Sequence, residues 1–354
     1  MLDFLDSQKV ATLDYLKQHL NRTAPSLARA GELGEDVIQR LLDYTAGGKM
    51  IRGALVTLGY GLAGGARPES VAPIAAAMEL TQSFLLIQDD IMDNDDQRRG
   101  KPAVHKQYAD LAWKRGFGGD NRHYGHAMAI CAGDVAFFLA LGLLGEAELT
   151  PQTYQRLVAQ FAEEVALVGV AQMHDVTNGV DIQEVEEQQI MRLYRYKTGR
   201  YTFSLPLMLG AIAGGADESL SRTLGELGEE IGIIFQIKDD EIGIFATDDR
   251  SGKPVGSDIT ENKKTVLRAR LFAAAPPAER SVLERLFGAD TITEHDLAYI
   301  RSLIESIGLR ATLQRELEDL AANVRSRIAE LFPTSNRWTE LLLELLQYNL
   351  SRDR

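Results

Sequence analysis

Apolar residues recur along most of the chain at the spacing of an α-helix. Positions four, three and four residues apart lie on one helical face, and such a row is formed by Leu80, Phe84, Ile87 and Ile91. The same spacing runs through three further stretches, 157–172, 224–240 and 341–350. Apolar–polar alternation bounded by tight turns, which marks a strand hairpin, is hard to find. The pattern therefore predicts an all-α fold.

Helix-breaking residues are few and stand between the long helical stretches. The clearest predicted loops are 46–48, 116–121, 247–261, 273–278 and 333–336. None of them is long enough or biased enough in composition to be an interdomain linker, and no repeat of solenoid period is visible. We therefore predict one helical domain over residues 1–354, although the length of the chain allows more than one.

One apolar stretch, residues 127–145, is long enough to resemble a membrane-spanning helix. Asp134 lies near its middle, and no cluster of basic residues flanks it to set an orientation. A helix that is apolar on all sides is also what the centre of a large helical protein requires. We therefore predict a buried central helix here, and no stable membrane insertion.

The composition, with 45% apolar and 25% charged residues, is that of a soluble globular protein. The formal net charge of −13 repels nucleic-acid phosphates, so DNA and RNA are not expected as partners. The one cysteine, Cys131, excludes an intramolecular disulfide, and no signal peptide opens the chain. These features predict a cytoplasmic protein.

The first cluster of acidic residues, DDIMDNDDQRRG, begins at Asp89 and ends an apolar helix. Asp89 and Asp93 are four residues apart and project from one helical face, whereas Asp90 points about a quarter-turn away. Like charges at this spacing destabilise a helix, so something should compensate them. Mg²⁺ suits such a face, because it typically takes one or two protein carboxylates and completes its shell with water and phosphate oxygens. Arg98 and Arg99 follow at once and can hold phosphate directly.

A second cluster, FQIKDDEIG at residues 235–243, again ends an apolar helix with a pair of aspartates, Asp239 and Asp240. The loop that follows contains Lys253 and Lys263, so a metal ion and an anion can bind side by side. Either cluster alone is compatible with a solvated helix end. Two clusters, each at the end of an apolar helix, are a much rarer pattern and favour a metal-dependent site for an anionic substrate.

In their order and spacing these segments resemble the trans-isoprenyl diphosphate synthase family, the polyprenyl synthetases, over nearly the whole chain. The matching segments, in the family's order, are GGKMIR at 47–52, the first Asp-rich motif at 89–99, AQMHD at 171–175, KTG at 197–199 and FQIKDD at 235–240. Because all of them occur together and in order, the match is highly specific.

The chain departs from the family's pattern at a few positions. Ala171 stands where the third segment usually has glycine, and Gly243 stands where many members carry a third aspartate in the second motif. Met50 and Gly53 replace residues that are often basic and proline, and Gln82 takes a position held by His or Gln in other members. The second motif therefore offers only its two leading aspartates in this register.

The resemblance implies an isoprenoid-synthase helical bundle with a central active-site cavity. It also implies a prenyltransferase of isoprenoid biosynthesis, which extends an allylic diphosphate with isopentenyl diphosphate. Three Mg²⁺ ions would be held by Asp89, Asp93 and Asp239. A homodimer is expected from the family as well.

The resemblance also implies roles for the residues around the metal ions. The allylic diphosphate would be held by Arg99, Lys197 and Lys253. Isopentenyl diphosphate would be held by Gly48, Lys49, Arg52, Gln82 and Arg98. Lys263 belongs to the same basic loop as Lys253 and is a further substrate-binding candidate. Thr198 and Gln236 would direct oxygen dipoles at the allylic cation.

In the family, bulk on the helix that runs back from Asp89 sets the length of the product. Leu85 lies one turn back, close to the Asp89 face, Phe84 lies about 140° around the helix, and Thr81 lies further along. An aromatic residue five positions before the motif, with none at four, resembles members that form geranylgeranyl diphosphate. Farnesyl diphosphate or a longer product stays open, and Phe84 is alternatively an ordinary core aromatic residue.

Two other functions share part of this pattern. A terpene cyclase would have the first Asp-rich cluster, but it usually lacks the GGKxxR segment and the second pair of aspartates. A non-catalytic subunit of a synthase tends to lose one Asp-rich motif, whereas both are present here. The preferred allylic primer and the pathway served stay open.

Overall fold

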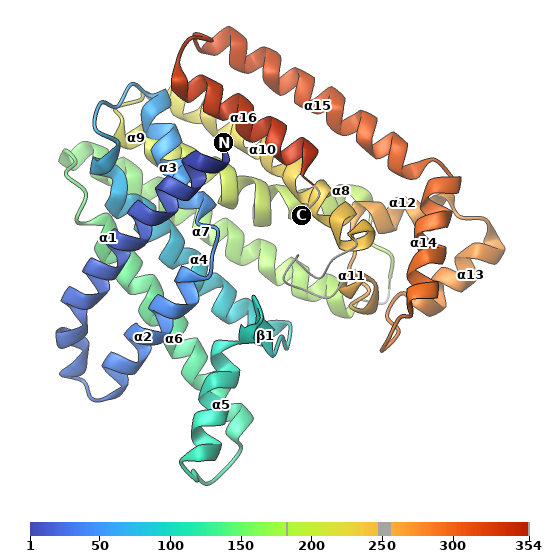
Figure 1. Cartoon of the computed structure of the whole chain (residues 1–354), viewed down its shortest axis with the longest axis horizontal. Coiled ribbons are helices and arrows are strands. Elements are labelled where there is room, and N and C mark those ends of the chain that lie inside the picture. Colours follow the sequence, from blue (N-terminus) through green and yellow to red (C-terminus); the bar gives the residue numbers. More distant parts are fainter. Residues whose placement is uncertain (182, 247–255, 353–354) are drawn as a thin grey trace. The chain divides into compact units, whose positions relative to one another are not determined.

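The computed structural model describes residues 1–181, 183–246 and 256–352, and nearly all of its secondary structure is helical (Figure 1). Within these ranges the strands are β1 (Gln97–Arg98) and β2 (Lys101–Pro102), which pair antiparallel as a small hairpin. The all-α fold class predicted from the sequence is confirmed.

The chain divides into two compact units, Met1–Ala159 with Pro206–Ser221, and Gln160–Leu205 with Arg222–Arg354. The single domain stays a prediction.

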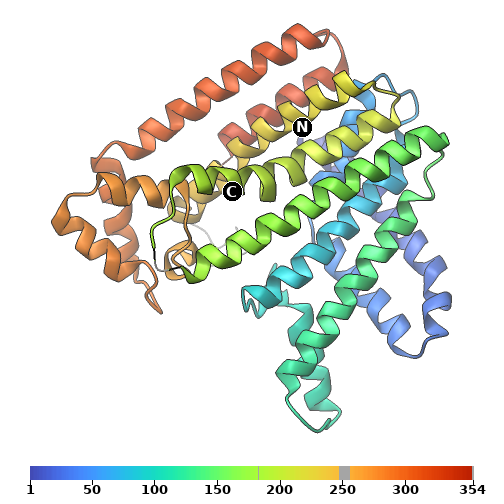
Figure 2. The ribbon, with the colours of Figure 1, turned by 180° about the vertical axis from the view of Figure 1, so that it is seen from behind.

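The first unit is built around α4. Its elements are α1 (Leu2–Ala28), α2 (Leu33–Ala46), α3 (Ile51–Leu62), the 3₁₀ turn η1 (Pro68–Val71), α4 (Ala72–Met92), α5 (Val104–Lys114), α6 (Asn121–Leu144), the start of α7 (Pro151–Val180) and most of α9 (Leu205–Ala213). Helix α4 packs against α1, α3 and α6, and Figure 2 shows α4 (blue) and α6 (green) side by side. Because α4 is apolar and largely buried, it holds its polar C-terminal end in a defined place.

Helix α6 contains the long apolar stretch, and the prediction that it is buried on all sides is wrong. Ala129 and Ala136 are fully buried, but Ile130 and Phe138 are 45% and 69% exposed. Sequence alone cannot separate a face covered by the same chain from an apolar face left for another surface. Two stretches in the described part of the chain are long and apolar enough to cross a membrane: η1 together with α4, and α6. This is a weak indication by itself, and 67% of the most apolar window of the first stretch is buried.

The second unit contains the rest of α7 and the C-terminal helices. Its further elements are α8 (Glu187–Leu193), the π-helix η2 (Tyr194–Ser204), most of α10 (Glu218–Phe245), α11 (Ser257–Thr260), α12 (Val266–Ala274), α13 (Pro277–Leu286), α14 (Glu294–Ser306), α15 (Leu309–Leu331) and α16 (Arg337–Ser351). Figure 1 shows α15 and α16 as an antiparallel pair, and α8 with α12 to α15 surround a common apolar core.

The three long helices predicted in 157–172, 224–240 and 341–350 are confirmed as parts of α7, α10 and α16. The predicted loop 273–278 is shorter than expected, because α12 continues to Ala274 and α13 begins at Pro277. Proline is favoured in the first turn of a helix, where its missing N–H has no partner to lose. The predicted loop 247–261 contains the short α11, and residues 247–255 lie outside the described ranges.

Candidate active site

The first acidic cluster lies at the C-terminal end of α4, where its aspartates differ in exposure. Asp89 and Asp90 are in the last turn of the helix, and Asp93 is its C-cap. The Asp90 side chain is fully buried, that of Asp89 is 17% exposed, and Asp93 is exposed. The helix stops here as Asn94 adopts a left-handed conformation with a φ of 56°. The two aspartates expected on one face are therefore the more accessible ones.

Asp90 and Arg98 form a buried pair behind that face. Arg98 Nε donates to Asp90 Oδ1 at 2.6 Å, and the Tyr44 hydroxyl donates to Asp90 Oδ2 at 2.9 Å. Arg98 Nη2 also lies 3.5 Å from carboxylate oxygens of Asp89 and Asp95. Burial raises the pKa of Asp90, and the positive charge of Arg98 works against that rise. Arg98 thus supplies compensation for the crowded carboxylates, while its contact with isopentenyl diphosphate stays a prediction.

Arg99 lies against the loop between α2 and α3, which contains the two glycines of the GGKxxR segment. A Cβ at Gly48 would lie 3.3 Å from both Nη atoms of Arg99, and one at Gly47 would lie 3.4 Å from its Cδ. Arg99 Nη1 donates to the Tyr44 carbonyl oxygen at 3.1 Å. Small residues in this loop therefore leave room for the guanidinium, and the structure brings two of the predicted phosphate-binding segments together.

The buried carboxylate of Glu79 binds the backbone at the start of α3, directly after the same loop. Glu79 is 5% exposed, and its Oε1 accepts the Gly53 N–H at 2.7 Å in the first turn of α3. Burial raises the pKa of Glu79, and the positive charge of Arg52 opposes that rise. Arg52 is half-buried and Lys49 is exposed. Glu79 therefore anchors the start of α3 and, through it, the two basic residues assigned to isopentenyl diphosphate.

The residues predicted to set product length all lie on α4. Phe84 packs on α6, with its ring centre 5.1 Å from that of Phe137 and an angle of 42° between the rings. Thr81 is fully buried and donates to the backbone carbonyl four residues back. Leu85 and Gln82 are half-buried. The aromatic pair shows Phe84 as a packed residue, and its role in product length stays a prediction.

The second acidic cluster lies near the C-terminal end of α10 and repeats the pattern of the first. Asp240 is 3% exposed, whereas the Asp239 side chain is 52% exposed. Asp239 pairs with Arg352 from the C-terminal segment, and this guanidinium lies 3.9 Å from the centre of the Phe235 ring. In both clusters the first aspartate of the pair is accessible and the second is buried. The accessible one is, in each pair, the residue that the sequence assigns to the metal.

A chain of hydrogen bonds joins Asp240 to the KT segment. Thr198 Oγ1 donates to Gln236 Oε1 at 2.7 Å, and Gln236 Nε2 donates to Asp240 Oδ1 at 2.9 Å. The Tyr194 hydroxyl donates to the other oxygen of Asp240 and accepts the N–H at the start of α12 at 3.0 Å. Burial raises the pKa of Asp240 to about 7, against the opposing charge of Lys263. The Gln236 oxygen accepts one hydrogen bond here and keeps a second lone pair, and its role toward a cation stays a prediction.

The lysines predicted to hold diphosphate lie next to carboxylates. Lys197 Nζ donates to Asp175, and Lys263 Nζ lies 3.5 Å from Asp258 Oδ1. Burial lowers the pKa of Lys263, but the neighbouring carboxylates, Asp258 first, outweigh it and leave the pKa raised. Lys263 is therefore a charged group in this structure. Lys253 lies outside the described residues.

The KT segment belongs to the π-helix η2, a rare backbone form that is frequent at functional sites. On one side η2 is tied to α7, because Arg200 Nε donates to Glu164 Oε2 at 3.0 Å and Glu164 is only 1% exposed. On another side it touches α10, where a Cβ at Gly232 would lie 2.5 Å from the Gly199 Cα. A buried ion pair and a glycine contact therefore fix the segment that carries Lys197.

The structure also explains the glycine in the second acidic motif. A Cβ at Gly243 would lie 2.9 Å from Asp258 Oδ2. The Gly243 carbonyl accepts the Gly256 N–H at 3.1 Å, which holds the segment around Asp258 against α10. The Asp258 carboxylate therefore fills space that a third aspartate side chain would take.

We expect Gly243→Asp to lower the free energy of unfolding by about 1–3 kcal/mol, because it forces a second carboxylate into occupied space. Urea denaturation measures this change. Adding Asp258→Ser removes both the crowding and the repulsion, so the double variant should recover most of the loss. A double variant as unstable as the single one would contradict the explanation.

The carboxylates of the two clusters suit Mg²⁺, which prefers oxygen ligands and commonly keeps several waters. The end of α4 presents Asp89 and Asp93, and the end of α10 presents Asp239. Across residues 1–181, 183–246 and 256–352 no three His, Cys, Asp or Glu side chains gather around one point. Those residues thus do not form an all-protein cage, and water and substrate oxygens would complete the shell of a bound ion.

Several residues that organise the site were not singled out from the sequence. The sequence offered a signal for Glu79, because a lone carboxylate inside an apolar helix must be paired or hydrogen-bonded when buried. Glu164 stands beside Glu163, and the pattern did not show which of the two is buried. Nothing in the sequence indicated that Tyr194 and Arg352 belong to the site, because their partners lie 46 and 113 residues away along the chain.

Comparison with known proteins matches this arrangement to one family. The polyprenyl synthetase family model matches residues 35–304. A geranylgeranyl diphosphate synthase of Saccharolobus solfataricus is 33% identical over 317 residues, which cover 87% of this chain and 88% of the relative. A farnesyl diphosphate synthase of Geobacillus stearothermophilus is 33% identical over 274 residues, 74% of this chain and 82% of the relative. A geranylgeranyl pyrophosphate synthase of Corynebacterium glutamicum, solved with isoprenyl diphosphate and magnesium, has a TM-score of 0.90, 28% identity and 99% coverage of each chain.

Proposed function

This chain belongs to the polyprenyl synthetase family, and we propose that it extends dimethylallyl, geranyl and farnesyl diphosphate with isopentenyl diphosphate to give geranylgeranyl diphosphate. Membership makes the protein a prenyltransferase, and a requirement for Mg²⁺ is typical of the family. The proposal rests on the two helix ends at Asp89 and Asp239, where an accessible aspartate stands beside a buried, hydrogen-bonded one.

In the proposed reaction the allylic carbon–oxygen bond breaks, the isopentenyl double bond attacks the allylic carbon, and a proton is lost to the departing diphosphate. Mg²⁺, when bound, acts as a Lewis acid that neutralises the leaving charge. We assign Asp89, Asp93 and Asp239 as its ligands, with three ions as in the family. Their accessible oxygens support this assignment, whereas Asp90 and Asp240 are engaged in internal hydrogen bonds.

We assign Arg99, Lys197 and Lys253 to the allylic diphosphate. Fixed positive charges aimed at a leaving group stabilise the charge that develops there without reorganisation. The ion pair between Lys197 and Asp175 supports this role, because it holds the ammonium group in place before a substrate arrives. The assignment of Lys197 is further supported because η2, which carries it, is fixed by the ion pair with Glu164 and by the glycine contact with α10.

We assign the basic loop after α2 to isopentenyl diphosphate, through Gly48, Lys49 and Arg52, with Gln82 and Arg98 beside it. The carboxylate of Glu79 under the loop supports this assignment. It partly balances the charge of Arg52, and Lys49 of the same loop is exposed.

We propose that Phe84 forms part of the floor that limits the product to twenty carbons. Its packing against Phe137 supports a rigid end to the space for the growing product, because two packed aromatic rings resist displacement. The relatives do not agree on one product: a geranylfarnesyl diphosphate synthase of Aeropyrum pernix is 29% identical over 308 residues.

We expect Phe84→Ala to lengthen the products, because it removes one ring of this pair and opens space beneath the growing chain. Chromatography of dephosphorylated products measures their length. Phe203→Ala, which removes a buried ring from a comparable aromatic pair with Phe235, serves as the control for general loosening. An unchanged product spectrum for Phe84→Ala would argue against a floor role.

The proposed function is tested by incubating the purified protein with isopentenyl diphosphate and each of the three allylic diphosphates. We expect one main product of twenty carbons from all three primers. A fifteen-carbon product that is not extended would support the farnesyl alternative. A hydrocarbon formed from the allylic substrate alone would support a terpene cyclase, and no product without a second protein would support a regulatory subunit.

We also propose that two copies of the chain associate through the exposed face of α6 that carries Ala127, Ile130 and Phe138, with the exposed Asp134 between the last two. These residues recur at helical spacing, and Ile130 and Phe138 are 45% and 69% exposed. Exposed apolar side chains grouped on one helical face suit a self-complementary contact around a two-fold axis, with the charge of Asp134 left at the edge of the contact or hydrated.

We expect Phe138→Glu to shift the protein from dimer to monomer, because it replaces the largest exposed apolar side chain of this face by a second charge four residues from Asp134. Sedimentation velocity measures the mass. Trp113→Glu, which changes another exposed aromatic residue on α5, is the matched control and should leave the dimer intact. A monomeric wild type, or a dimer that survives Phe138→Glu, would contradict the proposed surface.

A further inference from the structure

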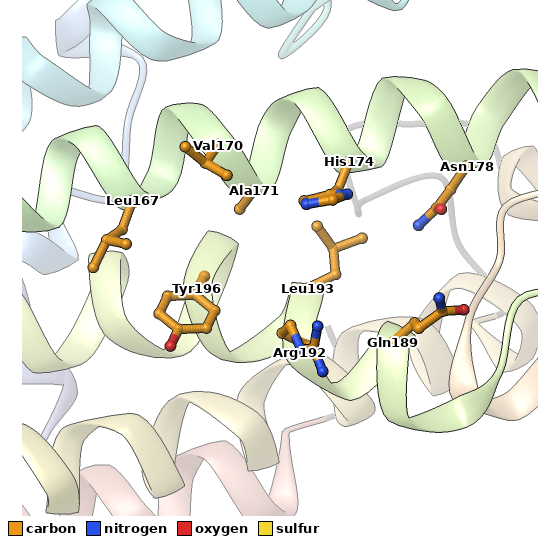
Figure 3. Close-up of a pocket in the computed structure, with 9 residues that line it drawn as sticks. All are labelled: Leu167, Val170, Ala171, His174, Asn178, Gln189, Arg192, Leu193 and Tyr196. Atoms are coloured by element: carbon orange, nitrogen blue, oxygen red, sulfur yellow. The ribbon is translucent and has the colours of Figure 1, made fainter.

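A pocket lies between α7 and the α8–η2 segment, entirely within the second unit (Figure 3). Its volume is about 180 Å³. One wall comes from α7 and consists of Leu167, Val170, Ala171, His174 and Asn178. The other wall comes from α8 and η2 and consists of Gln189, Arg192, Leu193 and Tyr196. None of the assigned substrate-binding or metal-binding residues lines it.

The pocket is polar at one end and apolar at the other. Figure 3 shows Leu167, Val170 and Ala171 together at one end, and Asn178 and Gln189 facing each other at the opposite end. An elongated ligand with an apolar body and a polar head would match this order, since each end would meet groups of its own kind.

The lining has positive charge and no acid. No aspartate or glutamate is among its nine residues, although the whole chain has 51 acidic and 38 basic residues. Nearby Arg195 and Arg200 pair with Glu229 and Glu164, but within the described ranges Arg192 has no carboxylate partner. Figure 3 shows Arg192, an exposed residue, about midway along the pocket, between Tyr196 and Gln189. A guanidinium there favours an anion, above all a phosphate, which it can hold with two parallel hydrogen bonds.

Gln189 adds a hydrogen-bond donor at the polar end, next to Arg192 along the wall. Its Oε1 accepts the Glu186 N–H at 3.2 Å as part of the capping box of α8. The amide NH₂ is therefore the group left to contact a ligand. Gln189 and Arg192 both offer donors, which is again what an anionic head needs.

The volume limits the apolar part of the ligand. An apolar cavity of roughly 150 Å³ accommodates benzene, whereas drug-sized ligands need about 300 Å³ or more. The pocket thus holds a body of about five or six carbons, and the rest of a twenty-carbon chain would lie outside it in water. We infer that it is a second binding site for a short isoprenoid diphosphate, the dimethylallyl or isopentenyl class. This inference rests on the proposed function for the identity of the ligand.

The pocket is distinct from the candidate active site, although the same two segments build both. On α7, Asp175 projects about 100° around the helix from His174, and on η2, Lys197 follows Tyr196. The ion pair between Lys197 and Asp175 therefore lies on the neighbouring faces of the two segments. A ligand in the pocket would leave the groups assigned to the allylic diphosphate uncovered.

The test is calorimetric titration of the full-length protein with dimethylallyl diphosphate in the presence of EDTA, which removes the metal-dependent allylic site. We expect the wild type to bind two molecules, one lost in Arg52→Gln and the other weakened about 10- to 100-fold in Arg192→Gln. Arg195→Gln, an exposed arginine of the same segment that does not line the pocket, is the matched control and should bind as the wild type does. Inorganic diphosphate and dimethylallyl alcohol should each bind more weakly to the Arg192 site than dimethylallyl diphosphate.

Equal binding curves for Arg192→Gln and Arg195→Gln would overturn the inference, and so would a pocket that binds inorganic diphosphate as tightly as dimethylallyl diphosphate. Product formation at low substrate concentration should be the same in Arg192→Gln as in the wild type. A wild type that forms no prenyl product would refute the proposed function instead, and the binding measurement would still report on the pocket.

Discussion

Asp239→Ala is expected to lower kcat at saturating Mg²⁺ by at least about 10²-fold, with the protein still folded. The side chain is 52% exposed at the end of α10 and is assigned to a metal ion that neutralises the leaving diphosphate. Removing one preorganised group that stabilises charge in a transition state typically costs about 10²–10³ in rate, and loss of a metal ligand acts on the same charge. Steady-state kinetics with isopentenyl and farnesyl diphosphate measure the effect.

Arg352→Gln separates this effect from loss of an ion pair. Asp239 pairs with Arg352 in the structure, so both variants break the same contact from opposite sides. We expect Arg352→Gln to keep most of the activity, because the carboxylate stays available to the metal. Asp89→Ala should behave as Asp239→Ala does. Near wild-type rates in either aspartate variant would contradict the assignment of the two clusters.

Arg200→Ala is expected to lower the free energy of unfolding by about 3–5 kcal/mol. Glu164 is 1% exposed, and Arg200 binds it through Nε and Nη2. Removing one partner of a buried ion pair leaves an uncompensated charge in the interior, which costs far more than the pair itself contributes. Denaturation in urea, followed by circular dichroism, measures the change. Because η2 also carries Lys197, kcat should fall in the same variant.

Arg327→Ala is the matched control for this prediction. Arg327 bonds two glutamates, Glu226 and Glu230, in a similar manner, but all three side chains are partly or largely exposed. Exposed pairs contribute about 0–1 kcal/mol, so the control should change little. Combining Arg200→Ala with Glu164→Gln removes the buried charge and should recover stability. Equal losses in Arg200→Ala and Arg327→Ala would show that burial of Glu164 is not the cause.

The sequence predicted the helices well, because their apolar rows are long and regular. Helix α4 ends at the first acidic cluster, as the pattern predicted, whereas α10 continues to Phe245, five residues beyond the second pair of aspartates. The split within each pair also followed in part, because residues one apart on a helix point in different directions. What surrounds the buried aspartates could not be predicted, since the partners Tyr44 and Tyr194 come from distant segments.

Two other features show where sequence reasoning fails. The exposed face of α6 could not be predicted, because Phe138 and the buried Ala136 belong to the same apolar run. Gly243 could be recognised only as a departure from the family's pattern. The cause is the Asp258 carboxylate, 15 residues further on, which lies 2.9 Å from the position of its missing Cβ.

The central claim is that this protein couples release of diphosphate to the addition of isopentenyl units. The most direct measurement is the ratio of inorganic diphosphate released to isopentenyl diphosphate consumed, with farnesyl diphosphate as primer and Mg²⁺ present. One diphosphate released for each isopentenyl unit consumed, with neither change when either substrate is left out, is the predicted result. Release of diphosphate from farnesyl diphosphate without consumption of isopentenyl diphosphate would contradict it.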